Sequence, residues 1–310
     1  MGQLDGLLLI NKPAGITSHD VVAKVRKKLK RKDIGHAGTL DPIATGLIIL
    51  LLGEATKISE YVLTGDKGYR LKAQFGFTTD MWDVTGKTLE STDFRPRIED
   101  VRSVASQMIG DFLWPVPVYS AVKVDGRKLY ELARQGVAVE SPQKNMRFWG
   151  VEVEHVTSEE IIATIYCSKG SFIRTWVYEM GRKLGCGATL TGLERLYSAP
   201  FSLSQAVSLA DLEAASDHEL EAILRQPSFV PLRETLLNWE ALTVNGKDQK
   251  LLYNGQISYD LERRLIPLVR ECIATNKTLG VRVLSGENGQ LLSLIEAQPG
   301  RGLKIRRVFR

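Results

Sequence analysis

Several features are scarce in this sequence, and each absence removes a class of protein. Three cysteines in 310 residues, with no CxxC pair, suggest neither a disulfide framework nor a zinc site, and the four histidines show no HxH or HxxxH spacing. The chain has no GxxxxGK[ST] loop, and no GxGxxG follows a predicted strand. Its longest apolar run, residues 47–52, is far too short to cross a membrane. We therefore expect a reducing compartment and chemistry without a metal, nucleotide or other cofactor.

The N-terminal residues carry no basic stretch of the kind that opens a secretory signal, so a cytoplasmic location is expected. The formal net charge is +5, which fits a polyanionic partner without requiring one. Seven of the nine residues from 24 to 32 are Lys or Arg, and Lys304, Arg306, Arg307 and Arg310 lie close to the C-terminus. Such a basic run fits phosphate binding and a solvated helix face equally well.

Hydrophobic periodicity predicts an α+β fold with no regular βαβ alternation. Apolar or alternating runs predict strands at residues 7–10, 47–52, 69–75 and 161–166, whereas helical spacing marks residues 18–29, 55–63, 98–108 and 171–184. The polar segment 78–86 is expected to be a loop. A boundary near residues 226–228 divides the chain into predicted domains of 1–227 and 228–310. The second domain has short predicted strands at 281–284, 290–295 and 303–308, as small all-β RNA-binding modules do.

Residues 35–46 (GHAGTLDPIATG) hold one acid, one imidazole and three glycines between a basic helix and an apolar strand. Glycine permits positive φ and a close approach of the backbone to a ligand, and Asp-Pro sets a turn. A carboxylate such as Asp41 on this loop can act as a nucleophile or as an acid or base. By composition alone, an Asp-Pro pair is more typical of an ordinary capped turn.

The order of residues in this loop resembles the catalytic loop of the bacterial tRNA pseudouridine synthases of the TruB type, which modify uridine-55 of the T loop. Further segments resemble the same family, in order along the chain. They are residues 7–15 (LLLINKPAG), 65–70 (GDKGYR), 117–123 (PVYSAVK), 126–136 (GRKLYELARQG), 167–175 (CSKGSFIRT) and 185–188 (GCGA). The resemblance implies a mixed-sheet catalytic domain, followed by a small β-rich PUA-like domain whose resemblance is weaker.

The resemblance implies that Asp41 is the nucleophile, attacking either the ribose carbon that bears the base or the pyrimidine ring. A carboxylate in a dry pocket needs a cation to stay ionised, and Arg174 is the matching residue. Tyr69 is expected to stack on the target base. Phe172 stands where many relatives carry tyrosine, so the last proton transfer is assigned to Tyr69 or water.

Four residues are expected to bind the substrate. Leu193 would close the apolar side of the pocket and Phe172 would form a flat wall. His36 would fill the space that the extruded uridine leaves in the T loop or stack on an exposed base, since such enzymes must take the target base out of its stack. Lys12, together with the basic residues 24–32, would contact phosphates.

The implied function is a stand-alone isomerase that acts on the T arm of tRNA, without a cofactor or an obligatory protein partner, and as a monomer. A related synthase guided by a separate RNA would need partner proteins, and the short N-terminus and modest tail do not favour it. An RNA-binding or RNA-folding protein without catalysis is the alternative from another class. The presence of Asp41, Tyr69 and Arg174 argues against it.

Overall fold

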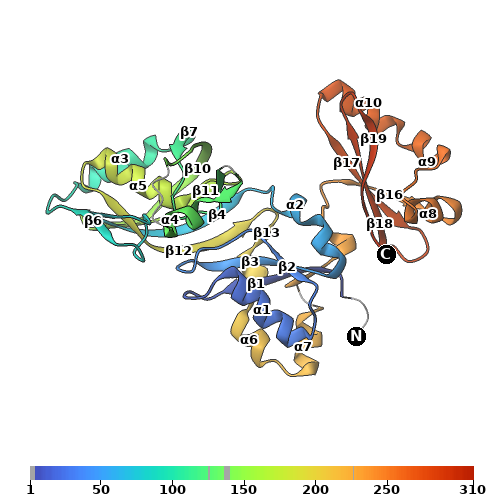
Figure 1. Ribbon diagram of the computed structural model, residues 1–310, viewed down its shortest axis with the longest axis horizontal. Coiled ribbons are helices and arrows are strands. Elements are labelled where there is room, and N and C mark those ends of the chain that lie inside the picture. Colours follow the sequence, from blue (N-terminus) through green and yellow to red (C-terminus); the bar gives the residue numbers. More distant parts are fainter. Residues whose placement is uncertain (1–3, 125, 136–139, 226) are drawn as a thin grey trace.

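The most apolar strand of the chain, β3 (Thr45–Leu52), lies inside a large mixed sheet in the computed structural model. The structure describes residues 4–124, 126–135, 140–225 and 227–310, so the predicted boundary residue Gln226 and the motif residue Gly136 lie outside the described residues. Figure 1 shows an elongated molecule, with the C-terminal segment forming a separate body at one end. No helix of the described residues is long and apolar enough to span a membrane.

The large sheet has eleven strands in the described part of the chain, with the main order β14-β1-β3-β12-β4-β11-β10-β7. Its pairs are mostly antiparallel, but β12 runs parallel to β3, and β1 runs parallel to β14. Besides β3, the strands are β1 (Gly6–Lys12), β2 (Ile34–Ala37), β4 (Lys67–Phe75), β7 (Gly110–Pro115), β10 (Gln143–Val156), β11 (Glu160–Cys167), β12 (Ala188–Ser198), β13 (Phe201–Ser202), β14 (Val207–Ser208) and β15 (Phe229–Pro231).

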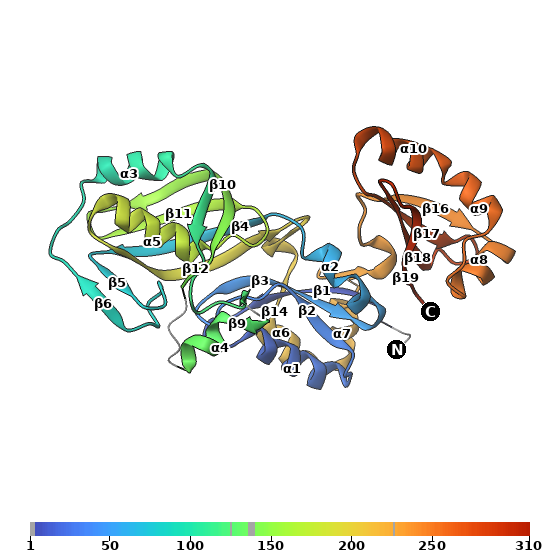
Figure 2. The same cartoon turned by 45° about the horizontal axis from the view of Figure 1, so that its top comes forward.

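Helices cover this sheet on separate patches, as Figure 2 shows. One apolar cluster joins α3 and α5 to β4, β10, β11 and β12, and a second joins α1, α6 and α7 to β1 and β3. The bounds of these and the smaller elements are α1 (Ser18–Leu29), η1 (Gly53–Ile58), α2 (Ser59–Val62), β5 (Phe77–Thr79), β6 (Thr88–Ser91), α3 (Ile98–Gln107), β8 (Lys123–Val124), β9 (Arg127–Lys128), α4 (Leu129–Arg134), α5 (Ile173–Leu184), η2 (Leu203–Gln205), α6 (Leu209–Ala214), α7 (Asp217–Ile223) and η3 (Leu232–Glu234).

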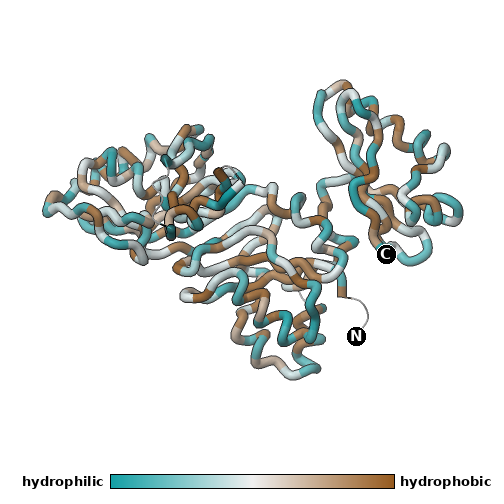
Figure 3. The backbone as a smooth tube through the Cα atoms, viewed as in Figure 1, coloured by the Kyte–Doolittle hydropathy of each residue, from teal (hydrophilic) through white to brown (hydrophobic). Residues whose placement is uncertain are grey.

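The strands β1 and β3 are buried on both faces, which explains why their sequences are continuously apolar rather than alternating. Leu8 and Ile48 belong to the cluster under α1, while Leu7 and Ile49 belong to a third cluster on the opposite face. Figure 3 shows these two strands as hydrophobic stretches of the tube near the middle of the molecule.

The C-terminal body is a four-stranded sheet, β16 (Glu240–Val244), β17 (Leu279–Ser285), β18 (Leu291–Gln298) and β19 (Gly302–Val308), in that order. The predicted β-rich character is therefore correct. Three helices were not predicted, namely α8 (Gly246–Tyr253), α9 (Tyr259–Arg264) and α10 (Ile266–Thr275). The expectation of an all-β module is wrong in this respect. Each helix buries few residues, only Leu252 in α8 and Leu261 in α9, so its apolar periodicity is weak.

The division into domains 1–227 and 228–310 remains a proposal. The short strand β15, just after the proposed boundary, pairs with β1 of the large sheet, and the second sheet begins at β16. We propose that residues 228–239 connect the two domains while lying along the first.

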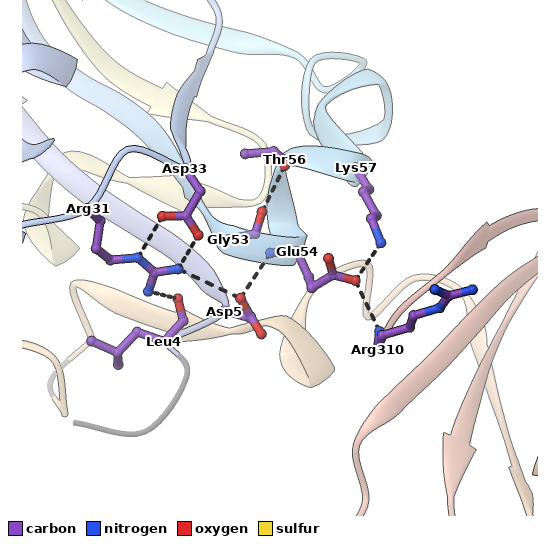
Figure 4. A network of polar contacts seen from close by, with 9 residues as sticks. All are labelled: Leu4, Asp5, Arg31, Asp33, Gly53, Glu54, Thr56, Lys57 and Arg310. Carbon is purple, nitrogen blue, oxygen red and sulfur yellow. Dashed lines mark hydrogen bonds and ion pairs between the residues drawn. The ribbon is translucent and has the colours of Figure 1, made fainter. Parts of the chain in front are cut away.

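The two sheets meet at η1 and α2. Lys57 donates from Nζ to the Val308 carbonyl at 3.0 Å, and Arg307 forms an ion pair with Glu60 at 2.6 Å. Figure 4 shows the neighbouring contacts, in which Glu54 accepts hydrogen bonds from Lys57 and from the backbone N–H of Arg310. The C-terminal segment is thus held against the element that leads into β4.

Most predicted elements of the catalytic part are present, with small changes at their ends. The predicted helix 55–63 is a 3-10 turn followed by one α-helical turn. The predicted loop 78–86 is partly wrong, because Phe77–Thr79 forms β5 and pairs with β6. The long strands β10 and β12 were not predicted.

Candidate active site

The loop between β2 and β3 is fixed by hydrogen bonds from two neighbouring segments. Ser18, at the start of α1, accepts a hydrogen bond from the Leu40 N–H at 2.9 Å and donates one to the Leu40 carbonyl at 3.2 Å. The Gly15 N–H bonds to the Pro42 carbonyl at 2.8 Å, and the Ala44 N–H closes the Asp-Pro turn on the Asp41 carbonyl at 3.0 Å. This loop therefore presents Asp41 from a fixed backbone.

The conformation of the loop depends on two glycines with positive φ, Gly38 (φ 90°) and Gly46 (φ 94°). A Cβ atom at Gly46 would lie 2.4 Å from the Arg195 carbonyl oxygen, because β3 and β12 pair there in parallel. Close strand packing and the loop's return into β3 therefore both require glycine at this position.

Arg174 lies at the start of α5, opposite the loop, and two of its nitrogens contact the Asp41 carboxylate. Its Nε is 3.1 Å from one carboxylate oxygen and its Nη2 is 3.4 Å from the other. The side chain of Arg174 is 4% exposed, whereas that of Asp41 is 36% exposed. This is the forked arrangement that favours an ionised carboxylate, with the Asp41 oxygens still accessible to a ligand.

A second carboxylate, Asp83, lies on the other side of the same guanidinium. Its oxygen is 3.7 Å from the Arg174 Nη1, and its side chain is 3% exposed. Arg174 also donates to the Met81 carbonyl at 3.1 Å and to the Tyr119 carbonyl at 3.0 Å. The guanidinium is thus fixed by backbone and carboxylate together. Asp83 was not predicted, since it falls within the segment expected to be a polar loop.

The site is a pocket of about 500 Å³ between the Asp41 loop, β4, β12 and α5. Tyr69, Phe172 and Leu193, which were all predicted, line it with Asp41 and Arg174. Burial raises the pKa of the Tyr69 hydroxyl above its usual range. The pocket thus combines an aromatic and aliphatic wall with a carboxylate held by a cation, the composition of a small-ligand site.

The structure contradicts the phosphate contact expected for Lys12. Its side chain is fully buried, and its Nζ donates to the carbonyls of Pro13 at 2.9 Å and Ile16 at 2.8 Å. Burial lowers the pKa of Lys12 to about 8. The lysine therefore fixes the turn after β1 and does not present its ammonium group to a ligand.

The basic helix is also less available than its sequence suggests. Lys24 pairs with Glu213 at 2.8 Å, Lys28 donates to the Glu213 carbonyl at 2.9 Å, and Arg26 donates to the Ile34 carbonyl at 2.6 Å. The basic run 24–32 thus serves partly to attach α1 to α6 and β2.

His36 lies on β2 and is not among the residues that line the pocket. Its ring makes an edge contact with His19 at 5.1 Å between centroids, and its Nδ1 is buried without a hydrogen-bond partner among the described residues. Burial lowers the pKa of His36, which favours the neutral ring. A neutral, partly buried imidazole beside the pocket can stack on a base.

Two further pocket residues, Lys67 and Arg195, were not predicted. Lys67 is itself part of the motif 65–70, and burial, followed by the charge of Arg195, lowers its pKa to about 8. Arg195 follows the predicted Leu193 by two residues on β12. A buried cation cannot be distinguished from a surface cation in one sequence without the strand register.

Comparison with solved structures shows the fold. The chain superposes on a structure described as an H/ACA RNP bound to a substrate RNA containing 2′-deoxyuridine, with a TM-score of 0.68, 18% identity, and coverage of 98% of this chain and 85% of the other. It also superposes on a Cbf5–Nop10–Gar1 complex, with a TM-score of 0.68, 18% identity, and coverage of 99% and 85%.

Comparison of sequences shows the family. Residues 26–173 match the model of the TruB family pseudouridylate synthase N-terminal domain, and residues 174–243 match the tRNA pseudouridylate synthase B C-terminal domain. The tRNA pseudouridine synthase B of Bdellovibrio bacteriovorus is 46% identical, covering 99% of this chain and 98% of the relative. That of Clostridium acetobutylicum is 35% identical, covering 94% and 100%.

The fold and these matches place the chain among the pseudouridylate synthases, which are isomerases. Within that class it belongs to the TruB family.

Proposed function

We propose that this chain isomerises uridine-55 in the T loop of tRNA to pseudouridine, with Asp41 as the nucleophile. The observation that carries the proposal is the forked pair between Arg174 and the accessible Asp41, at 3.1 and 3.4 Å, inside a pocket lined by Tyr69, Phe172 and Leu193. The names of the related proteins, tRNA pseudouridine synthase B, support tRNA as the substrate.

The reaction needs a nucleophile that stays ionised in a pocket shielded from water. Desolvation disfavours a charged carboxylate, and an adjacent guanidinium reverses that effect. Arg174 supplies this charge permanently, and its ion pair with Asp83 and its hydrogen bonds to two backbone carbonyls hold it beside Asp41. Asp83 is therefore proposed as a positioning residue.

The other pocket residues are proposed to hold the extruded base. Tyr69 stacks on it, Phe172 forms a second flat wall, and Leu193 closes the apolar side. His36 lies on β2, shortly before Asp41 in the sequence, and is proposed to fill the vacated space in the T loop. Phe172 has no hydroxyl, so the final proton is removed by Tyr69 or by water.

We propose that the chain acts alone, as a monomer in the cytoplasm, and needs no cofactor. The isomerisation is redox-neutral and uses no group donor, so all of its atoms come from the substrate. The C-terminal body is proposed to be a PUA-like module that adds RNA contacts.

An unmodified tRNA transcript, incubated with the protein alone and mapped by carbodiimide labelling and primer extension, tests the proposal. We expect one new stop, at the T-loop uridine. Asp41→Asn removes the nucleophile but keeps the shape of the side chain, so it should give no stop while tRNA affinity is retained. Tight binding by the wild-type chain without any stop would instead indicate a protein that only binds or folds tRNA. A stop with Asp41→Asn would exclude Asp41 as the nucleophile.

A further inference from the structure

Arg195 is a buried cation in the active-site pocket, and no salt bridge to it is formed by the residues that the structure describes. It is 2% exposed. Its Nε donates to the Leu47 carbonyl at 2.6 Å, but its Nη2 is buried and has no hydrogen-bond partner among the residues that the structure describes. A buried charged donor without a partner is costly, and such a group in a pocket indicates a ligand that supplies the missing acceptor.

Two buried lysines lie near Arg195. The buried Lys12 and Lys67 lie close enough for Arg195 to help lower the pKa of each, after the larger effect of burial. Ser120, also in the pocket and 5% exposed, has a buried hydroxyl without a hydrogen-bond partner in the described part of the chain. The pocket thus holds a buried guanidinium and a buried hydroxyl that both have unused hydrogen-bonding capacity, and the ligand group that matches the guanidinium is an electron-rich oxygen.

The strand register places Arg195 between the Asp41 loop and Tyr69. Arg195 on β12 is directly opposite Tyr69 on β4, so the two side chains leave the same face of the sheet as nearest cross-strand neighbours. On the other side, a Cβ atom at Gly38 would lie 3.5 Å from the Arg195 Nη1. The loop that carries Asp41 therefore passes over the guanidinium.

A uridine nucleotide offers two kinds of electron-rich oxygen, those of the phosphodiester and those of the uracil carbonyls. The phosphodiester belongs to the RNA backbone, which stays outside the pocket and keeps most of its water. Arg195 is 2% exposed, so only the extruded base can reach it. We propose that the Nη2 of Arg195 donates to a carbonyl oxygen of the target uracil and stabilises the negative charge that develops on the ring during the reaction. This inference rests on the proposed function.

The same assignment serves both routes that are open to Asp41. Attack on C1′ of the ribose breaks the C1′–N1 bond, and its electron pair stays on uracil, spread over N1 and the carbonyl oxygens. Attack on C6 moves the C5=C6 pair onto the C4 carbonyl oxygen as an enolate, and the C1′–N1 bond breaks afterwards. In both routes C5 then bonds to C1′, Asp41 leaves with its electron pair, the C5 proton passes to a base, and N1 takes up a proton. A fixed donor at a developing oxyanion is worth more in a water-poor site than in water.

Two substitutions separate this role from a structural one. Arg195→Gln and Arg195→Lys both lose the Nε bond to Leu47, but only lysine keeps the positive charge. We expect Arg195→Gln to slow single-turnover pseudouridine formation by about 10²–10³-fold, the effect of losing one oxyanion donor, and Arg195→Lys to retain a clear part of the rate. Arg70→Gln is the matched control, since Arg70 adjoins Tyr69 on β4 but is 47% exposed and pairs with Glu154.

A transcript with 5-fluorouridine at the target position gives a second readout, the consumption of that nucleoside. Fluorine withdraws electrons and lets the ring carry negative charge more easily, so the loss caused by Arg195→Gln should shrink on this substrate. Equal rates for the glutamine and lysine variants, or equal losses on both substrates, would overturn the inference. A loss confined to tRNA affinity would also overturn it and assign Arg195 to a phosphodiester. If the wild-type chain converts no uridine, the proposed function fails and this inference with it.

Discussion

Arg174 contacts two carboxylates and two backbone carbonyls, so its planar shape matters as much as its charge. A lysine at this position has a single ammonium group, which cannot span both Asp41 oxygens and still reach Asp83. We expect Arg174→Lys to lower the single-turnover rate by about 10²-fold or more, because a small misplacement of the nucleophile has effects of this size. Affinity for tRNA, measured by filter binding, should change little.

Arg182→Lys provides the control for this substitution. Arg182 lies on the same helix, but its side chain is 61% exposed and its salt-bridge partner is Glu179. Its replacement should leave the rate unchanged. A wild-type rate in Arg174→Lys would show that activity does not depend on the contact of two Arg174 nitrogens with Asp41.

The lowered pKa of Lys67 predicts how the stability of the fold depends on pH. Burial, and next the charge of Arg195, lowers its pKa to about 8 in the folded chain, whereas an unfolded lysine titrates near about 10.4. Between these values the unfolded state binds a proton that the folded state does not, so this group makes stability rise with pH. Below about pH 8 Lys67 is protonated in both the folded and the unfolded state, so the full cost of burying its charge lowers the free energy of unfolding.

Urea unfolding of Lys67→Met and of the wild type at pH 7, 8, 9 and 10 measures this effect. The stability of the variant relative to the wild type should be greatest at pH 7 and decrease towards pH 10. Lys72→Met controls for removing a lysine from the same strand, since its side chain is 47% exposed and pairs with Glu160. A difference that stays constant from pH 7 to 10 would contradict the prediction.

At the scale of single residues, the motifs singled out a group of residues that share one pocket. Asp41, Tyr69, Phe172, Arg174 and Leu193 were chosen from motifs, and the pocket brings all five together. Asp83, Lys67 and Arg195 were missed because their roles depend on burial. Lys12 was misread for the same reason, since an exposed and a buried lysine look identical in a sequence.

At the scale of elements, the position of the catalytic loop depends on α1. The Ser18 hydroxyl satisfies both the N–H and the carbonyl of Leu40, next to Asp41, and it is 1% exposed. Ser18→Ala would leave two buried backbone groups without a partner. We expect a loss of about 1–3 kcal/mol in the free energy of unfolding, and a fall in kcat larger than the rise in KM.

Chemical denaturation and steady-state kinetics of Ser18→Ala test this expectation. Ser106→Ala is the matched control, because the Ser106 hydroxyl bonds to the Ser103 carbonyl at an exposed site in α3. An unchanged kcat in Ser18→Ala, with the loss of stability observed, would show that the loop holds its shape without this serine.

The elements that could be predicted are those whose burial produces a clear period. The strands β1 and β3 are apolar throughout because both faces are covered, and α1 places Val21, Val22 and Val25 on one buried side. The strand β12 escaped prediction because it carries the charged residues Glu194 and Arg195 towards its middle, which interrupts the apolar pattern. The strand β10 contains Gly150, and its register shifts between Trp149 and Glu152, so its alternation is interrupted.

At the scale of the whole molecule, two kinds of contact hold the C-terminal body to the catalytic part. The ion pairs of Glu60 with Arg306 and Arg307 involve side chains that are 26–45% exposed. Exposed pairs of this kind contribute about 0–1 kcal/mol each and are screened by salt. The apolar contact is buried, since Leu291, Leu294 and Phe309 belong to the same cluster as Ile58 and the outer face of β1.

These magnitudes predict that the apolar contact dominates. Phe309 is 1% exposed, and replacing a buried phenylalanine by alanine costs about 3–5 kcal/mol. We therefore expect the C-terminal body to stay docked in 1 M NaCl and in Glu60→Gln, but to detach in Phe309→Ala.

Hydrogen exchange of η1 and α2, with small-angle scattering for overall dimensions, measures docking. Ile273→Ala on α10, where the side chain is 66% exposed, is the control. Detachment in high salt alone would show that the ion pairs dominate, and since Glu60 also lines the pocket, it would make ionic strength a direct influence on the active site.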